Sequence, residues 1–276
     1  RMSNDLISED VQEKYIVPGL ERGLRLLCEF SHKDRVLSAP ELARRLKVPR
    51  STVFRLLTTL EVMGFIERVD GGRDFRLGMA VLRLGFEYLA SLELTELGRP
   101  LLDRLRDDIH YPCNLVVRDG RSIVYVAKSV APTPFTSSVN VGTRLPAHAT
   151  VLGRVLLADL SLAELRQLYP EPQLEVFSAN TPRTVEELFE MVQRDREHGY
   201  VLQEGFFEAN ISTIAAPVLD RAGKVVAALG TTIPSPRIEP AQLDLMIDKV
   251  RAAAGELSYL LDYRPASGKV VNLFRE

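Results

Sequence analysis

The chain has 276 residues, of which 46% are hydrophobic, and it carries 35 Lys and Arg against 37 Asp and Glu. That length exceeds the usual size of one domain, so we expect two domains, and the apolar content is ample for folded cores. No apolar run approaches the roughly 18 residues that a membrane-spanning helix needs, and the polar, acidic residues 1–14 predict no signal peptide, so we expect a cytoplasmic protein.

The first part of the chain predicts a polar arm followed by a helix. Residues 1–15 are expected to form a disordered arm. Residues 16–30 have apolar side chains at helical spacing, and one face would carry Leu20, Leu24, Leu27 and Phe30. We expect that face to pack against the two helices that follow.

Residues 38–60 predict two short helices joined by a tight turn. Ser38, followed by Glu41 three residues later, is typical of a helix start, and Pro40 suits the first turn. Val48 should lie outside this helix, because a residue before proline avoids helical geometry. The apolar positions of the first helix are Ala39, Leu42, Ala43 and Leu46, and those of the second helix, residues 50–60, are Val53, Leu56, Leu57 and Leu60.

Residues 64–77 predict a hairpin after the two helices. Gly64 would end the second helix, and residues 65–69 and 73–77 alternate as paired strands do. Asp70 and Gly71 at the tip can supply the positive backbone angles of a tight turn. Residues 16–78 are therefore predicted to form a winged helix-turn-helix domain.

The outward face of the second helix predicts DNA binding, because it is short and polar and suits base edges in a major groove. The residues expected to face bases are Ser51, Thr52, Arg55 and Thr58, with Phe54 against a thymine methyl, and those expected to hold phosphates are Arg50, Arg68, Arg73 and Arg76. Residues 21–80 carry 12 basic against 8 acidic side chains, whereas the chain from residue 81 carries 21 against 25, which favours a basic head on an acidic body. Small domains of this pattern that bind no DNA also occur.

Residues 79–92 predict a helix that is apolar nearly all round. A surface helix should be polar on one side, so this helix needs partners on both sides. We expect residues 79–94 to link the two domains and to form the seam of a dimer. The alternative is a helix buried between two domains of one chain.

Residues 95–265 predict a larger α+β domain, followed by a tail at residues 266–276. Helices are expected at residues 95–109, 148–157, 162–168, 184–198 and 240–261, and strands at residues 113–117, 122–127, 135–139, 201–203, 212–219 and 225–233. Antiparallel strands flanked by helices are typical of the α+β class.

The residues argue against an enzyme. The chain has no Gly-x-Ser-x-Gly elbow, phosphate-binding glycine loop or paired metal ligands, and Cys28 and Cys113 lack metal-like spacing. His148 is the only histidine in a tight motif, and a lone histidine beside small residues is more often structural than catalytic. We therefore expect no catalytic activity, no cofactor and no metal. The alternative to a DNA-binding protein is a small-molecule sensor that acts through protein contacts.

Eight short segments between residues 16 and 262 carry a family resemblance. They are residues 20–24 (Leu-Glu-Arg-Gly-Leu), 50–53 (Arg-Ser-Thr-Val), 75–78 (Phe-Arg-Leu-Gly), 144–150 (Arg-Leu-Pro-Ala-His-Ala-Thr), 153–158 (Gly-Arg-Val-Leu-Leu-Ala), 198–200 (His-Gly-Tyr), 214–218 (Ile-Ala-Ala-Pro-Val) and 227–230 (Ala-Ala-Leu-Gly). Each segment alone is a weak signal, but in this joint order they resemble the IclR family of bacterial transcription regulators.

The resemblance implies a one-component regulator whose larger, GAF-like domain binds a small metabolite, often an organic acid. It also implies homodimers formed through the DNA-binding part, which often pair into tetramers. Residues 75–91 and 138–150 further resemble the subgroup that controls aromatic-acid catabolism, such as the use of protocatechuate or 4-hydroxybenzoate.

The same resemblance implies the effector-binding positions, which are Val151, Leu152, Gln203, Thr213, Gly230 and Thr232. The backbone of Val151 and Leu152 would lie near a ligand carboxylate. The family often has an acidic residue at position 203 and serines near positions 230 and 232, so this chain departs from the pattern. Neutral Gln203 is compatible with an anionic effector, which a nearby acid would repel. The alternative for Thr213 and Thr232 is an ordinary structural role in strands.

Overall fold

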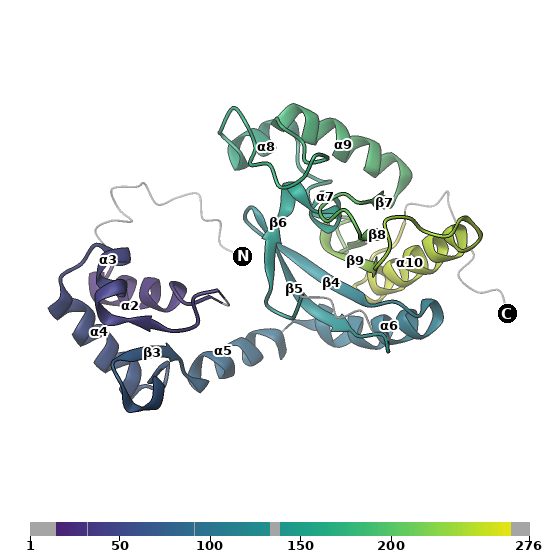
Figure 1. Ribbon diagram of the computed structural model, residues 1–276. Helices are drawn as coiled ribbons and strands as arrows, with labels where there is room; N and C mark the ends of the chain where they lie inside the picture. Colours follow the sequence, from purple (N-terminus) through teal and green to yellow (C-terminus); the bar gives the residue numbers. More distant parts are fainter. Residues whose placement is uncertain (1–14, 32, 91, 133–138, 266–276) are drawn as a thin grey trace. The chain divides into compact units, whose positions relative to one another are not determined.

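The computed structural model of the chain describes residues 15–31, 33–90, 92–132 and 139–265. Contacts within it divide the chain into two compact units, Arg1–Ser91 and Leu92–Glu276 (Figure 1). Each unit has its own cluster of buried hydrophobic side chains. Within the described ranges, no helix is long and apolar enough to cross a bilayer.

The N-terminal unit is a winged helix-turn-helix, which confirms the predicted fold. Its elements are α2 (Pro18–Cys28), β1 (Leu37–Ser38), α3 (Ala39–Leu46), α4 (Arg50–Val62), β2 (Ile66–Arg68), the 3-10 turn η1 (Val69–Gly71), β3 (Asp74–Leu77) and α5 (Met79–Ala90). The strands form an antiparallel sheet in the order β1-β3-β2. The sequence did not predict β1, which is only two residues long and pairs with β3.

Local chemistry explains where these elements begin and end. The hydroxyl of Ser38 accepts the backbone N–H of Glu41 at 3.4 Å, as expected for a helix cap. Lys47 ends α3 in the left-handed region, with a φ of 54°. At the tip of the wing, Asp70 and Gly71 have φ values of 50° and 68°, so this turn takes the positive angles that the sequence predicted.

The core of the N-terminal unit corrects the predicted face of α2. Leu20 and Leu24 are exposed, whereas Leu26 and Phe30 are buried in the core. Gly23 faces the core with them, and a Cβ added there would lie 3.9 Å from Leu56 Cδ2. This distance is an ordinary van der Waals contact, so Gly23 lies on the face of α2 that packs against α4, and Leu27 of the predicted face is partly buried beside it.

The C-terminal unit has one sheet, five α-helices and one 3-10 turn in the described residues. Its elements are α6 (Glu93–Ile109), β4 (Cys113–Asp119), β5 (Ser122–Ser129), β6 (Arg144–Pro146), the 3-10 turn η2 (Ala147–Ala149), α7 (Val151–Leu156), α8 (Leu162–Leu168), α9 (Val185–His198), β7 (Val201–Glu204), β8 (Ser212–Leu219), β9 (Val225–Ile233) and α10 (Pro240–Leu260). The antiparallel sheet has the order β6-β5-β4-β9-β8-β7.

Helices cover both faces of this sheet. A Cβ added to Gly98 of α6 would lie 2.9 Å from Leu115 and 3.3 Å from Leu257 of α10, so α6 and α10 pack on one face. A Cβ added to Gly230 would lie 2.9 Å from Leu152 of α7, so α7 packs on the other face. Successive residues of a strand point to opposite faces, and Asn114, next to Leu115, therefore points to the α7 side.

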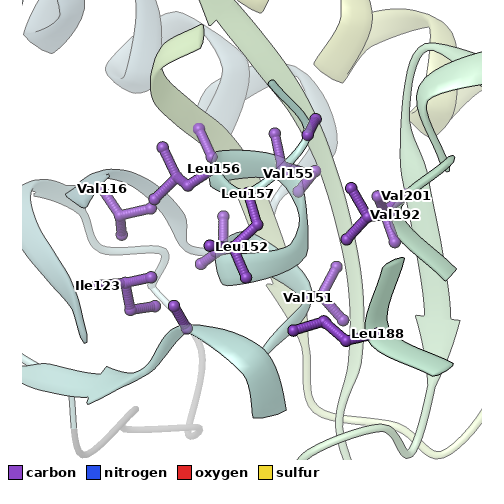
Figure 2. Close-up of a cluster of buried hydrophobic side chains, with 14 of the residues drawn as sticks. Val116, Ile123, Val151, Leu152, Val155, Leu156, Leu157, Leu188, Val192 and Val201 are labelled. Carbon is purple, nitrogen blue, oxygen red and sulfur yellow. The ribbon is translucent and has the colours of Figure 1, made fainter. Parts of the chain in front are cut away.

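The core of this unit surrounds α7. Figure 2 shows Val151, Leu152, Val155 and Leu157 among buried side chains from β4, β5, α9 and β7. This burial fixes α7 rigidly relative to the sheet, because closely packed interiors resist displacement.

The structure confirms some of the elements predicted for the larger domain and differs from others. The bounds predicted for α8, β8 and β9 are confirmed, but β6 was not predicted. The helix predicted at residues 148–157 is divided into η2 and α7, because Thr150 is extended and its hydroxyl accepts the N–H of Gly153 as a cap. The strand predicted at residues 135–139 falls largely outside the described residues, and Val139 itself is not in a strand.

Candidate DNA-binding face and ligand cavity

One face of α4 is exposed, and it carries most of the residues that the sequence assigned to bases. Arg50, Ser51, Phe54, Arg55 and Thr58 are exposed, and Thr52 is half-buried. Val53 and Leu57, on the opposite side, are buried in the core and hold the helix in place. The hydroxyl of Thr58 donates to the carbonyl of Phe54 at 2.9 Å, so it can only accept a further hydrogen bond.

The three arginines of the wing differ in their surroundings. Arg68 forms an ion pair with Glu61 at 2.9 Å and lies 4.8 Å from the centre of the Phe75 ring. Arg76 forms an ion pair with Glu67, which is its direct partner across the two strands. Arg73 is exposed at the wing, and no ion pair joins it to any described residue. Arg73, Arg50 and Arg55 therefore present charges that no described acid neutralises.

The C-terminal unit encloses a cavity of about 190 Å³ between α7 and the sheet. Its wall is formed by Asn114, Tyr125, Val139, Leu145, Thr150, Val151, Leu152, Phe206, Phe207, Glu208, Ile211, Thr213 and Thr232. Most of these side chains are apolar, and a few polar groups converge among them. This combination is typical of a site for a small organic ligand.

The first turn of α7 forms one side of the cavity. The backbone N–H groups of Val151 and Leu152 have no acceptor within the helix, because the first turn of any helix lacks one. Thr150 holds this turn in place through two hydrogen bonds. Its hydroxyl donates to the carbonyl of Pro146 at 3.0 Å and accepts the N–H of Gly153 at 3.2 Å. The two N–H groups can therefore bind an acceptor such as a carboxylate oxygen.

The other effector positions predicted from the sequence divide into two groups. Thr213 and Thr232 are partners across β8 and β9, and both line the cavity. Gln203 pairs with Thr213 but is not among the lining residues. Gly230 does not line the cavity either, because the space beside it is occupied by Leu152 of α7.

Several lining residues were missed in the sequence. Asn114 is the single polar residue within the apolar run at residues 113–117, which was a usable signal for an inward-facing polar group. Phe206, Phe207 and Glu208 lie in a connection between β7 and β8 with no regular pattern, so their position was not predictable from the sequence. Burial raises the pKa of the Tyr125 hydroxyl, and nearby Glu208 raises it further, so Tyr125 lines the cavity as a neutral group that can donate and accept.

His148 has a structural environment and is not part of the cavity wall. Its Nε2 lies 2.8 Å from the carbonyl oxygen of Glu175, and its ring makes edge contacts with Tyr169 and Phe177. No group of three or more His, Cys, Asp or Glu side chains in the described part of the chain is arranged to hold a metal ion.

Two family models match the chain. The model described as the IclR helix-turn-helix domain matches residues 19–70. The model described as bacterial transcriptional regulator IclR C-terminal matches residues 86–259.

Named relatives and a solved structure agree with these matches. The Pca regulon regulatory protein of Pseudomonas putida is 33% identical over 226 residues, which cover 82% of this chain and 77% of the relative. The p-hydroxybenzoate hydroxylase transcriptional activator of Acinetobacter baylyi is 30% identical over 265 residues, covering 92% and 95%. The crystal structure of an IclR transcriptional regulator from Alicyclobacillus acidocaldarius has a TM-score of 0.78 at 25% identity, covering 90% of this chain and 100% of that one. The chain therefore belongs to the IclR family of bacterial transcriptional regulators, which pair a helix-turn-helix DNA-binding domain with a C-terminal effector-binding domain.

Proposed function

We propose that this protein binds operator DNA through α4 and the wing and senses a small aromatic or related organic acid in the cavity beside α7. The main support is the cavity itself, which combines a largely apolar wall with several hydroxyls and with the first turn of α7, whose backbone N–H groups have no acceptor within the helix. An apolar wall suits a ring, and N–H donors suit a carboxylate. The two relatives named for the Pca regulon and for p-hydroxybenzoate hydroxylase support the same ligand class.

The proposal assigns a role to each part of the chain. Residues 16–78 bind DNA, residues 79–94 link the two domains, and residues 95–265 bind the effector through Val151, Leu152, Thr213 and Thr232. The protein acts by binding alone and catalyses no reaction. Because bacterial operator DNA lies in the cytoplasm, the proposal places the protein there.

On DNA, α4 would lie in the major groove. Ser51, Thr52, Arg55 and Thr58 face the bases, and Phe54 meets a thymine methyl. Arg50 and Arg73 hold phosphates directly, whereas Arg68 and Arg76 must exchange a carboxylate for a phosphate to do so.

The proposed function is tested by anisotropy titration of labelled DNA. The duplexes are the intergenic DNA upstream of the protein's own gene and a scrambled sequence, each at two salt concentrations, with and without a panel of aromatic and keto acids. We expect tight, salt-dependent preference for the upstream DNA, because phosphate contacts release counterions, and we expect one acid to change the affinity. Absence of any DNA preference would instead favour a sensor that acts through protein contacts.

Replacing Arg55 with alanine is expected to reduce discrimination between the operator and scrambled DNA by about 1–3 kcal/mol, because an arginine can bind a guanine edge through two hydrogen bonds. Anisotropy titration with both duplexes measures this loss. Arg73→Ala is the matched control, since it should weaken binding to both duplexes alike and lower the salt slope by about one. Equal weakening of both duplexes by Arg55→Ala would contradict its role in reading bases.

Replacing Leu82 with glutamate is expected to convert a dimer into a monomer. Met79, Leu82 and Leu84 of α5 are 74%, 49% and 57% exposed within the chain, and Met79 and Leu82, three residues apart, share one side of the helix that a second copy of the chain would cover. Light scattering after size-exclusion chromatography measures the mass. Leu245→Glu, at an exposed leucine of α10, should leave the dimer intact, and a dimer that survives Leu82→Glu would remove α5 as its seam.

A further inference from the structure

Asn114 places a free hydrogen-bond acceptor in the wall of the cavity. The residue is 2% exposed and lies on β4, beside β9. Its Nδ2 donates to the hydroxyl of Thr232 at 3.4 Å, but its Oδ1 is buried and has no hydrogen-bond partner among the described residues. A buried carbonyl oxygen without a partner is unfavourable, so this atom is a position where a bound molecule gains by supplying a donor.

The surroundings of Asn114 define the donor that fits. None of the described residues lining the cavity is Lys, Arg or His, and its single carboxylate, Glu208, belongs to an exposed residue. Thr150 already donates one hydrogen bond and accepts another. A charged donor would lose its hydration in this largely apolar wall, and the one carboxylate among the described lining residues is exposed, so a neutral O–H or N–H fits beside Asn114 better than a charged group. The apolar wall, which includes Leu145, Leu152 and Phe206, suits the ring or alkyl body that would carry that group.

We propose that Asn114 is a specificity-determining residue that accepts a hydrogen bond from a hydroxyl, or a similar neutral donor, on the effector. The inference rests on the proposed function, since it concerns the ligand of the same cavity. It divides the acids of the panel into two classes. Acids that carry a hydroxyl on the body of the molecule satisfy Asn114, and their unsubstituted counterparts leave it unpaired.

Isothermal titration calorimetry with paired probes tests the proposal on the full-length protein. Benzoate is compared with 3-hydroxybenzoate and 4-hydroxybenzoate, and succinate with malate. We expect the wild-type protein to bind the hydroxylated member of one pair at least about tenfold more tightly, because the unsubstituted acid buries Asn114 without a partner. In Asn114→Leu, which keeps the branched shape and the number of side-chain heavy atoms but has no acceptor, the ratio should fall to within about twofold.

Two further variants test whether the preference depends on the acceptor oxygen at residue 114. Asn114→Asp keeps an acceptor oxygen and loses the donor; its carboxyl group should weaken the binding of both members of a pair of acids, so the preference for the hydroxylated acid should be retained. Glu208→Gln should also retain that preference, because Glu208 is a separate acceptor in the wall. Thermal unfolding of each variant shows whether it is folded. The ratio of the two affinities is compared, because a general loss of structure would lower both affinities together.

The outcomes separate the inference from the proposed function. A preference that is lost in Asn114→Leu and kept in Asn114→Asp supports the inference. Three results overturn the inference and leave acid sensing in place. They are a preference that persists in Asn114→Leu, a preference that is lost in Asn114→Asp, and binding of the acids by the wild-type protein without any preference. Failure of every acid to bind, while operator DNA is bound, overturns acid sensing and the inference with it.

Discussion

Replacing Asp195 with alanine is expected to lower the unfolding free energy of the C-terminal unit by about 3–5 kcal/mol, because it leaves a buried charge without its partner. The guanidinium of Arg154 on α7 binds the carboxylate of Asp195 on α9 through two contacts of 2.8 and 2.6 Å. The two side chains are only 4% and 12% exposed. In the described part of the chain the Nη1 atom of Arg154 has no hydrogen-bond partner, so Asp195 is the main group that compensates the guanidinium charge.

The measurement is urea unfolding followed by hydrogen exchange of peptides that cover residues 151–156 and 185–198, which report on the C-terminal unit alone. Glu186→Ala is the matched control, because Glu186 pairs with Arg166 in the same unit but both side chains are more than half exposed. Exposed pairs contribute about 0–1 kcal/mol, so the control should change little. A double variant, Arg154→Met with Asp195→Leu, should recover most of the stability. Equal losses from Asp195→Ala and Glu186→Ala would show that burial does not govern this pair.

Asp195→Ala should also weaken effector binding. Arg154 follows Val151 and Leu152 on α7, and its guanidinium lies 4.8 Å from the centre of the Phe206 ring, which forms part of the cavity wall. The ion pair therefore holds both the first turn of α7 and one aromatic wall in position. DNA binding by the N-terminal unit, which has its own core, should be retained.

The parts of the fold that the sequence predicted correctly have strong local signals. Ser38 and the wing tip at Asp70 and Gly71 act through their own backbone neighbours, and both behave as expected. The bounds of α8 and β8 are equally local, since caps and turns mark them. The face of α2 was not determined in this way. Leu20 and Leu24 also have helical spacing, and only the assembled core shows that the buried face carries Gly23 and Leu26 instead.

The candidate sites depend on contacts between distant parts of the chain, which a local pattern does not report. The wing arginines illustrate this, because Glu61 and Glu67 neutralise Arg68 and Arg76 only after α4 and the strands are assembled. The cavity wall combines residues of β4, β5, α7, β8 and β9 with the connection at residues 206–211. A family resemblance gave the positions on α7 and the two threonines. Asn114 became significant only when the structure showed its oxygen buried and unpaired.

Replacing Gly153 with alanine is expected to destabilise the C-terminal unit by about 1–3 kcal/mol or more and to weaken effector binding strongly. A Cβ at this position would overlap the carbonyl oxygen of Ala147 and lie 2.5 Å from its carbonyl carbon. These are backbone atoms, so no side-chain rotation relieves the overlap, and α7 must move away from η2. That movement displaces the N–H groups of Val151 and Leu152 from the cavity.

Gly255→Ala in α10 is the matched control, because it is the same substitution but is expected to raise the unfolding free energy and not to lower it. Nothing lies within 4 Å of a Cβ added at Gly255, and alanine in the interior of a helix stabilises it by about 0.5–1 kcal/mol relative to glycine. Thermal unfolding and calorimetry with 4-hydroxybenzoate should therefore find Gly255→Ala slightly more stable with unchanged affinity, and Gly153→Ala less stable with reduced affinity. If Gly153→Ala matched Gly255→Ala in both measurements, the turn between η2 and α7 would accommodate a Cβ at residue 153 without a shift of the backbone. It would then not be the tight support on which the cavity depends.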